Sequence, residues 1–315
     1  MPSLDMPLEQ LKRYMGTNPK PDDFGEYWER ALEELDSWET VYEIRESEFK
    51  TPNIICYDLT FMALDGAKIY SKLLVPKVIE NPLPAIVEFH GYGGRSREWV
   101  TKLPLAEAGN IVLSMDIRDQ MGESGDGDYR RGNLIKGLDS EDRDALYYRS
   151  VYLDAVSLIR IAMDMEVVDN SRIATLGISQ GGAVALAAAA LEQRVSKVFS
   201  VYPFLSDFKR VWDMDLGESP YEELKFFFRF KDPLHKREEE IFTKLGYIDI
   251  QFLAEKIEGE VTFATALQDR ICPPSTQFAT YNKIKTSKNM LIYPDFGHED
   301  ITGLTDIIYQ WSLTL

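Results

Sequence analysis

The residue types best suited to chemistry in this sequence are a serine between glycines, a histidine near the end of the chain and a few carboxylates. Ser179 lies in G-I-S-Q-G, which runs from Gly177 to Gly181. This G-x-S-x-G spacing is typical of a nucleophile elbow, a strained turn that exposes a serine hydroxyl between a strand and a helix. The flanking positions need glycine because the strand and the helix approach each other closely there. The pattern predicts Ser179 as the nucleophile of an acyl-transfer reaction.

The same motif has a second interpretation, a Gly-Ser-Gly turn that closes over a phosphate. Turns of that kind carry a G-K-[ST] or a G-x-G-x-x-G pattern, and the chain contains neither. The elbow is therefore the favoured interpretation.

A nucleophilic serine needs a base to remove its proton, and the sequence has three histidines. His235 lies among charged residues at a predicted helix start, where we expect it to be solvated. His90 ends a predicted buried strand, in front of glycines, where a histidine more often supports the loop. His298 remains, and it gives the chain order serine, acid, histidine. We predict His298 as the base, with activity that falls at acid pH because a protonated imidazole cannot accept a proton.

Several carboxylates compete to hold His298 in the correct tautomer. Asp269 directly follows a predicted buried strand, and the I-C-P-P segment after it stiffens the loop that carries it. Asp295, Glu299 and Asp300 are alternatives, but they are so near His298 in the chain that reaching back to its ring is harder. Asp269 is the leading candidate for the acid.

The tetrahedral intermediate of acyl transfer needs hydrogen-bond donors for its negative charge. One predicted donor is the backbone N–H of Gln180, the residue after the nucleophile. The second is expected from the glycine-rich loop His90–Gly94, where main chain can approach a substrate closely. Tyr92 is the position that we predict in that loop.

The elements that must position these residues alternate along the chain. Asp65-Gly66 is a strong hairpin signal, and buried apolar runs later alternate with helical spacing. The predicted strands cover residues 41–48, 54–64, 68–75, 85–89, 111–115, 173–178, 195–202, 261–267 and 290–293, and the predicted helices cover 24–35, 103–108, 144–165, an alanine-rich segment after Gly182, and 302–313. An antiparallel opening followed by strand–helix alternation predicts an α/β fold with a mostly parallel central sheet flanked by helices.

Two segments interrupt this alternation within what we predict to be a single domain, 1–315. Residues 118–142 are rich in Gly, Asp and Arg without apolar periodicity, which predicts a long surface loop, and long loops are often functional. Residues 204–257 mix aromatic and charged side chains and are predicted to be a helical insertion before the acid-bearing strand. That insertion could be a lid or pocket wall, or an ordinary helical subdomain with an aromatic core.

The composition narrows the class of ligand. The 315 residues carry a net charge of −17, which argues against nucleic acid and anionic membrane as partners and favours a small or neutral substrate. Cys56 and Cys272 lie far apart, and no Cys/His cluster suggests a metal; we predict neither metal nor cofactor. The N-terminal sequence lacks the apolar core of a signal peptide, which predicts a cytoplasmic protein.

Taken together, motifs spread over almost the whole chain resemble the acetyl xylan esterase and cephalosporin C deacetylase family of α/β-hydrolases. They are F-G-E-Y-W from residue 24, F-H-G-Y at Phe89–Tyr92, Y-Y-R-S-V-Y-L-D-A-V at Tyr147–Val156, G-I-S-Q-G-G at Gly177–Gly182, V-Y-P-F-L at Val201–Leu205, D-R-I-C-P-P-S-T at Asp269–Thr276, and His298-Glu299.

The resemblance implies a catalytic triad of Ser179, Asp269 and His298, with the main-chain amides of Tyr92 and Gln180 as the oxyanion hole. It also implies removal of acetyl groups from acetylated sugars and related small esters, and a ring-shaped homo-oligomer, a hexamer, with active sites facing an internal space. The sequence departs from the family in two places that bear on the site. The family's Arg-Gly-Gln signature appears as Arg118-Asp119-Gln120 and is followed by Met121 instead of glycine, and the third elbow glycine is Ala183.

We therefore predict a cofactor-free serine carboxylesterase that acts on short acyl groups, chiefly acetyl, in acetylated xylo-oligosaccharides and esters such as cephalosporin C. A lactonase, a feruloyl-type esterase or a peptidase would use the same triad on another bond. A non-catalytic binding protein on the same fold is the remaining alternative.

Overall fold

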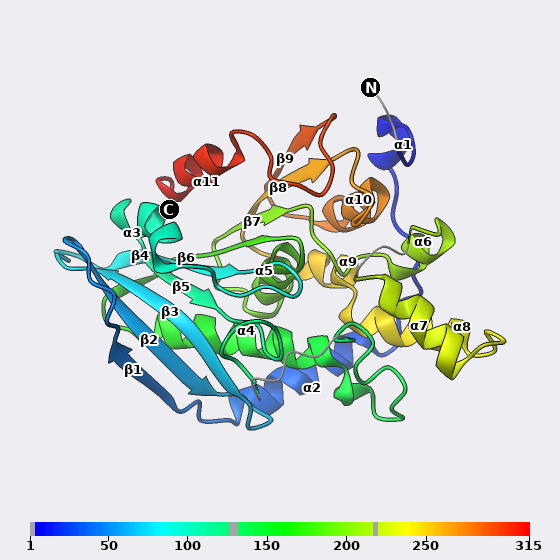
Figure 1. Ribbon diagram of the computed structural model, residues 1–315, viewed down its shortest axis with the longest axis horizontal. Coiled ribbons are helices and arrows are strands. Elements are labelled where there is room, and N and C mark those ends of the chain that lie inside the picture. Colours follow the sequence, from blue (N-terminus) through cyan, green and yellow to red (C-terminus); the bar gives the residue numbers. More distant parts are fainter. Residues whose placement is uncertain (1–3, 126–131, 217–219) are drawn as a thin grey trace.

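The computed structural model describes residues 4–125, 132–216 and 220–315, and these form one nine-stranded sheet in the order β1-β2-β3-β5-β4-β6-β7-β8-β9 (Figure 1). Strands β1 to β3 pair antiparallel, as do β3 and β5, whereas every neighbouring pair from β5 onward is parallel. The strands are β1 (Tyr42–Glu46), β2 (Ile54–Met62), β3 (Lys68–Pro76), β4 (Leu83–Phe89), β5 (Ile111–Met115), β6 (Val168–Ile178), β7 (Lys197–Val201), β8 (Glu260–Ala266) and β9 (Lys288–Tyr293). The predicted fold class is confirmed.

Helices cover both faces of this sheet (Figure 1). They are α1 (Leu8–Leu11), α2 (Phe24–Asp36), α3 (Leu103–Glu107), α4 (Tyr147–Met163), α5 (Gln180–Leu191), α6 (Phe208–Asp213), α7 (Glu222–Lys231), α8 (Glu238–Leu245), α9 (Ile250–Leu253), α10 (Pro274–Lys283) and α11 (Leu304–Ser312). The sequence analysis missed α10, because its apolar residues do not form a clear amphipathic stripe.

Strand β4 shows how the sheet separates two cores. Val87 and Phe89 point into the larger core, which α2, α4 and α5 cover, whereas Ile86 points into a second core with α3 and α11. Successive side chains of a strand point to opposite faces, so a continuous apolar run is what a strand buried on both faces requires. All twelve residues of α5 are buried, and its alanines allow the close approach to the sheet.

The loop 118–142 differs from the prediction of a surface loop. Arg118, Gln120 and Leu138 are buried, and Arg118 forms paired hydrogen bonds with Asp154 of α4 at 2.6 and 2.7 Å. Such buried loops are held by side-chain hydrogen bonds rather than by a regular apolar face, which explains why the sequence shows no periodicity there. Residues 126–131 of this loop lie outside the described residues.

The predicted helical character of residues 204–257 is confirmed by α6 to α9, except that residues 217–219 lie outside the described part. Phe204, Tyr221 and Phe228 are buried in it, whereas Phe226 and Phe230 of α7 are exposed. Its role as a lid stays a prediction, as does the assignment of residues 1–315 to a single domain.

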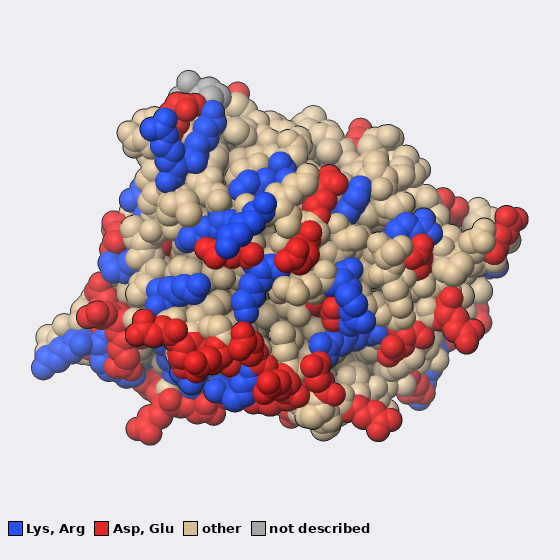
Figure 2. Space-filling view, turned by 180° about the vertical axis from the view of Figure 1, so that it is seen from behind, with Lys and Arg blue, Asp and Glu red and all other residues tan. Residues whose placement is uncertain are grey.

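The outward face of α2 is acidic, with Glu26, Glu29 and Glu33 exposed. Figure 2 shows acidic side chains gathered along the lower edge of the molecule, the edge along which α2 runs in Figure 1. The opposite side of the helix carries Trp28 and Leu35, both buried. Within the described ranges, no helix has the length and apolar character needed to cross a bilayer.

Candidate active site

Ser179 lies on a sharp turn between β6 and α5, with a φ of 58°. Its N–H donates to Val201 O at 2.9 Å, which fixes the turn to β7. A Cβ on Gly177 would lie 2.1 Å from the carbonyl carbon of Gly181, and one on Gly181 would lie 2.0 Å from Phe89 O. Both separations are far below van der Waals contact, so the G-x-S-x-G glycines are required by packing against backbone.

His298 brings the three predicted triad residues within hydrogen-bond reach. Its Nε2 lies 2.9 Å from Ser179 Oγ, and its Nδ1 lies 2.8 Å from Asp269 Oδ2. Asp269 is fully buried, and its Oδ1 accepts the N–H groups of Ile271 and Cys272 at 2.9 and 2.8 Å. The backbone of the loop after β8 thus holds Oδ1, whereas Oδ2 faces the imidazole and also accepts a long hydrogen bond from Gln277 Nε2 at 3.5 Å.

His298 lies in the loop after β9, and Tyr202 stabilises the position of this loop. The two rings have centroids 4.6 Å apart, and Tyr202 OH donates to Glu299 O at 3.0 Å. Neither Asp295 nor Asp300 bonds to the His298 ring among the described residues. The geometry therefore favours Asp269 over the competing carboxylates.

The other two histidines have different surroundings. His90 Nε2 accepts the N–H of Ile117 at 2.9 Å, so its proton sits on Nδ1, which donates to Gly91 O at 2.8 Å. Burial lowers the pKa of His90 and keeps the ring neutral, in the supporting position that the sequence predicts. His235 is exposed and lies 3.2 Å from Glu238, as predicted for a solvated side chain.

The glycine-rich loop after β4 passes directly over the serine. A Cβ on Gly91 would lie 3.9 Å from Ser179 Cβ, so the backbone that carries Tyr92 runs beside the nucleophile. Gly93 has a φ of 68°, a left-handed conformation that lets the loop turn back. The phenol of Tyr92 is directed to α7, where it donates to Glu223 Oε1 at 2.5 Å.

Two buried glutamine side chains, which the sequence analysis did not assign a role, support both predicted oxyanion donors. Gln120 Nε2 donates to Gln180 Oε1 at 2.8 Å, and Gln180 Nε2 donates back to Gln120 Oε1 at 3.1 Å. Gln120 Oε1 also accepts the N–H of Gly93 at 2.8 Å. The start of α5 and the His90–Gly94 loop are thus tied to each other. The Arg118-Asp119-Gln120 segment could have indicated a role for Gln120, because it corresponds to the family's Arg-Gly-Gln signature.

The carboxylate of Asp119, which replaces the family glycine, does not enter the group around Ser179. Its Oδ2 lies 2.6 Å from Lys136 Nζ. Its φ of 55° is the left-handed conformation that glycine adopts most readily. The substitution therefore keeps the backbone shape of this position.

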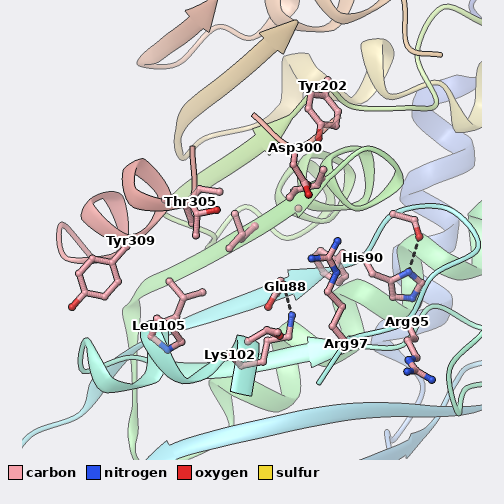
Figure 3. A pocket seen from close by; sticks show the side chains of 18 of the residues that line it. Glu88, His90, Arg95, Arg97, Lys102, Leu105, Tyr202, Asp300, Thr305 and Tyr309 are labelled. Atoms are coloured by element: carbon pink, nitrogen blue, oxygen red, sulfur yellow. Dashed lines mark hydrogen bonds and ion pairs between the residues drawn. The ribbon is translucent and has the colours of Figure 1, made fainter. Parts of the chain in front are cut away.

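A pocket of about 480 Å³ opens beside His298 and extends between α3, α11 and the sheet (Figure 3). One end is polar and the other is apolar. Among the residues that line it are Arg97, Lys102, Tyr202, Asp300, Ile308 and Tyr309. The sequence analysis considered Asp300 only as a competing acid and did not predict this pocket, because its walls come from segments far apart in the chain.

One group among the described residues combines metal-ligand types, namely Asp269, Cys272 and His298, whose ligand atoms lie within 4.8 Å of one another. However, the ring nitrogens of His298 and the carboxylate of Asp269 are already hydrogen-bonded. Burial, and then the Asp269 charge, raises the pKa of the Cys272 thiol, which disfavours the thiolate that binds metals. The group is suited to proton transfer.

Comparison with known proteins shows which proteins this chain is similar to. The chain is 47% identical to acetyl xylan esterase 1 from Thermoanaerobacterium sp. JW/SL YS485, whose crystal structure superposes with a TM-score of 0.95 over 99% of both chains. It is 33% identical to the acetyl xylan esterase from Paenibacillus sp. R4, with a TM-score of 0.92 over 98% of this chain and 99% of that one.

Among curated proteins, the acetyl esterase Axe7A of Xylanibacter ruminicola is 29% identical over 92% of this chain. The chain spans 65% of the length of that relative. The family model described as acetyl xylan esterase (AXE1) matches residues 1–315. The chain therefore belongs to the acetyl xylan esterase (AXE1) family.

Proposed function

We propose that this protein is a serine esterase that removes short acyl groups, chiefly acetyl, from acetylated sugars such as xylo-oligosaccharides and from small esters such as cephalosporin C. Family membership supports the acetyl ester. The observation that carries the mechanism is the imidazole of His298, which lies within hydrogen-bond distance of both Ser179 Oγ and Asp269.

In the proposed reaction, Ser179 Oγ attacks the ester carbonyl while His298 Nε2 takes the hydroxyl proton. Asp269 holds the proton on Nδ1, so that Nε2 is free to accept, and its charge stabilises the imidazolium. The N–H groups of Gln180 and Tyr92 donate to the oxyanion. His298 then gives its proton to the leaving alcohol, and the acyl group stays on Ser179.

Water completes the reaction. His298 takes a proton from a water molecule, the hydroxide attacks the acyl-enzyme, and collapse of the second tetrahedral intermediate releases acetate and returns the proton to Ser179 Oγ. The glutamine pair Gln120 and Gln180 supports preorganised donors, because it joins the two backbone segments that carry the N–H groups.

The test is hydrolysis of acetyl and longer p-nitrophenyl esters by the wild type and by Ser179→Ala. We expect the variant to lose about 10³-fold or more in kcat, and the wild type to prefer acetyl. The exposed Ser37 at the end of α2 offers a matched control, Ser37→Ala. Equal activity of the Ser179→Ala and Ser37→Ala variants would refute the mechanism.

The predicted ring-shaped homo-oligomer and cytoplasmic location stay predictions. Native mass spectrometry of the assembly tests the first, because a hexamer of this 36.1 kDa chain is easily distinguished from a monomer.

A further inference from the structure

The pocket beside His298 lies on the side of the site where a leaving alcohol must be. His298, Gly91 and Ile178 are among the residues that line it, whereas Ser179 and the Tyr92–Gln180 donor pair are not. His298 has to give its proton to the alcohol oxygen, so the alcohol portion of an ester lies on the imidazole side. The acyl portion then points away from this pocket.

Arg97 and Asp300 are the two charged side chains of this pocket that the protein leaves free. Among the described residues, neither has a hydrogen-bond or ion-pair partner. Figure 3 shows them entering the pocket from opposite sides. Burial, and then the Asp300 carboxylate, raises the pKa of Tyr202, while Arg97 opposes the shift, so both charges lie near the same phenol.

Each of the other charged side chains that line the pocket has at least one partner within the protein, although Glu88 Oε2 is buried without one. Lys102 Nζ lies 2.6 Å from Glu88 Oε1, and Arg95 lies 3.3 Å from Glu98. Glu299 Oε1 accepts the N–H of Gly297 at 3.0 Å.

The backbone of Arg97 is left-handed, as it is at seven other non-glycine residues of the described ranges. Its φ of 54° is a conformation that costs about 1 kcal/mol or more for a residue other than glycine. Strain of this kind persists only where the surrounding structure imposes it, and it clusters at functional sites. Here it accompanies a guanidinium directed into the pocket.

The opposite end of the pocket is apolar, with Leu105, Leu176, Ile308 and the ring of Tyr309. One free cation and one free anion at the polar end favour a neutral ligand with many hydroxyl groups over a charged one. A sugar ring has hydroxyl groups along its edge and C–H groups on its faces, which matches this division. The volume, about 480 Å³, lies in the range of roughly 300–1,000 Å³ that is usual for ligand pockets.

We propose that this pocket binds the sugar that carries the acetyl group, and that Arg97 and Asp300 determine specificity by bonding its hydroxyl groups. This inference rests on the proposed esterase function and names the site for the alcohol portion of the substrate. The Asp300 carboxylate accepts hydrogen bonds from the sugar hydroxyl groups, and the Arg97 guanidinium donates hydrogen bonds to their oxygens.

The first test measures binding without turnover. Xylotriose, the deacetylated product type, is titrated by calorimetry into Ser179→Ala and into the same variant with Arg97→Ala and Asp300→Asn. We expect the added substitutions to weaken binding by tenfold or more, because hydrogen bonds to charged groups are the strong ones. Undiminished affinity, or no binding of xylotriose to Ser179→Ala at millimolar concentration, would overturn the proposal.

The second test compares two esters in the catalytically intact protein. Acetylated xylotriose offers hydroxyl groups to Arg97 and Asp300, whereas the alcohol portion of ethyl acetate has no hydroxyl group for either side chain to bond. The ratio of kcat/KM for the two esters should fall by tenfold or more in Arg97→Ala and in Asp300→Asn. Matched controls remove a charge outside the pocket, at the exposed Arg13 and Asp306, and should keep the wild-type ratio.

An unchanged ratio in both pocket variants would overturn the assignment and leave the esterase function standing. A wild type that hydrolyses neither ester would instead refute the proposed function, and the xylotriose titration would still decide the role of the pocket.

Discussion

Asp269 and Asp207 are two fully buried carboxylates that accept backbone hydrogen bonds in the same way. Asp269 belongs to the candidate active site, whereas Asp207 has a structural role. In Asp269, Oδ1 accepts the N–H groups of Ile271 and Cys272 at 2.9 and 2.8 Å. In Asp207, Oδ1 accepts the N–H groups of Thr17 and Asn18, also at 2.9 and 2.8 Å. Burial and backbone bonding alone therefore do not identify a catalytic acid.

The difference lies in what the second oxygen meets. Oδ2 of Asp269 lies 2.8 Å from the imidazole of His298, which can take up a proton from Ser179. Oδ2 of Asp207 accepts a hydrogen bond from the phenol of Tyr14 at 2.7 Å. Burial raises the pKa of that phenol, so it keeps its proton at neutral pH. The first carboxylate orients the imidazole that accepts the serine proton, and the second anchors the segment before α2 to the start of α6.

The largest expected effect is a loss of kcat on substitution of Asp269, which we do not expect on substitution of Asp207. Asp269→Asn should reduce kcat by about 10⁴, because an amide no longer fixes the correct tautomer of His298 or stabilises its charge. Steady-state hydrolysis of p-nitrophenyl acetate measures the loss, and thermal unfolding checks that the variant is folded. Asp295→Asn serves as the control. If kcat falls in Asp295→Asn and not in Asp269→Asn, Asp269 is not the acid of the triad.

The second prediction concerns stability and leaves the reaction aside. Asp207→Ala removes the acceptor for Tyr14 OH and for the N–H groups of Thr17 and Asn18. We expect the free energy of unfolding to fall by roughly 3–5 kcal/mol, since each buried donor without a partner is costly. Urea unfolding measures this, and kcat of the folded fraction should stay close to that of the wild type. A drop in kcat as large as that of Asp269→Asn would show that the two regions are not separate.

The third prediction is a dependence of stability on pH that belongs to the Asp207 region. Burial, and then the charge of Asp207, raises the pKa of Asp249 to about 7, compared with about 3.9 for an unfolded aspartate. Between these values the folded protein keeps a proton that the unfolded chain has lost. The stabilisation is therefore complete below pH 4 and is lost as the pH rises through 7.

Asp249→Asn removes this titration. The difference in unfolding free energy between the wild type and the variant should fall by on the order of 2–3 kcal/mol from pH 4 to pH 8. Urea unfolding at several pH values gives this difference. A constant difference over that range would contradict the raised pKa.

The smallest effect on activity is expected at Tyr92, whose phenol is bonded to the carboxylate of Glu223 beside the His90–Gly94 loop. Glu223 accepts the N–H groups of Gly132 and Leu134 and the phenol of Tyr92, much as Asp207 does with Tyr14. Tyr92→Phe keeps the backbone N–H and removes only the bond from the phenol to Glu223. We therefore expect kcat/KM to fall only about two- to tenfold, roughly the net worth of one hydrogen bond. A loss of 10³ would mean that the hydroxyl itself touches the reacting atoms.

Much of the fold was predictable because its signals are local. Strand periodicity, the Asp65-Gly66 turn and the elbow glycines each depend on neighbouring residues, and the structure confirms these elements. Elimination among the three histidines also predicted that His298 pairs with Ser179, and the structure places the two side chains within hydrogen-bond distance. The catalytic role of the pair stays a prediction.

The features that sequence reasoning missed depend on distant segments. The amide pair of Gln120 and Gln180 joins residues 60 positions apart, and the polar end of the pocket joins Arg97 to Asp300. Asp207 gave no signal, because its partners lie in the segment before α2. Helix α10 was missed for a different reason, since its apolar residues lack helical periodicity although Pro274 suits a first turn.

The complete burial of α5 has a consequence for how the site moves. Amides in such a helix exchange with solvent only when the whole domain opens, so we expect α5 to be among the slowest segments in hydrogen–deuterium exchange. The Gln180 N–H at its first turn is therefore held by a helix that stays rigid on the timescale of turnover. Any segment that moves to admit substrate must belong to the loops around the site.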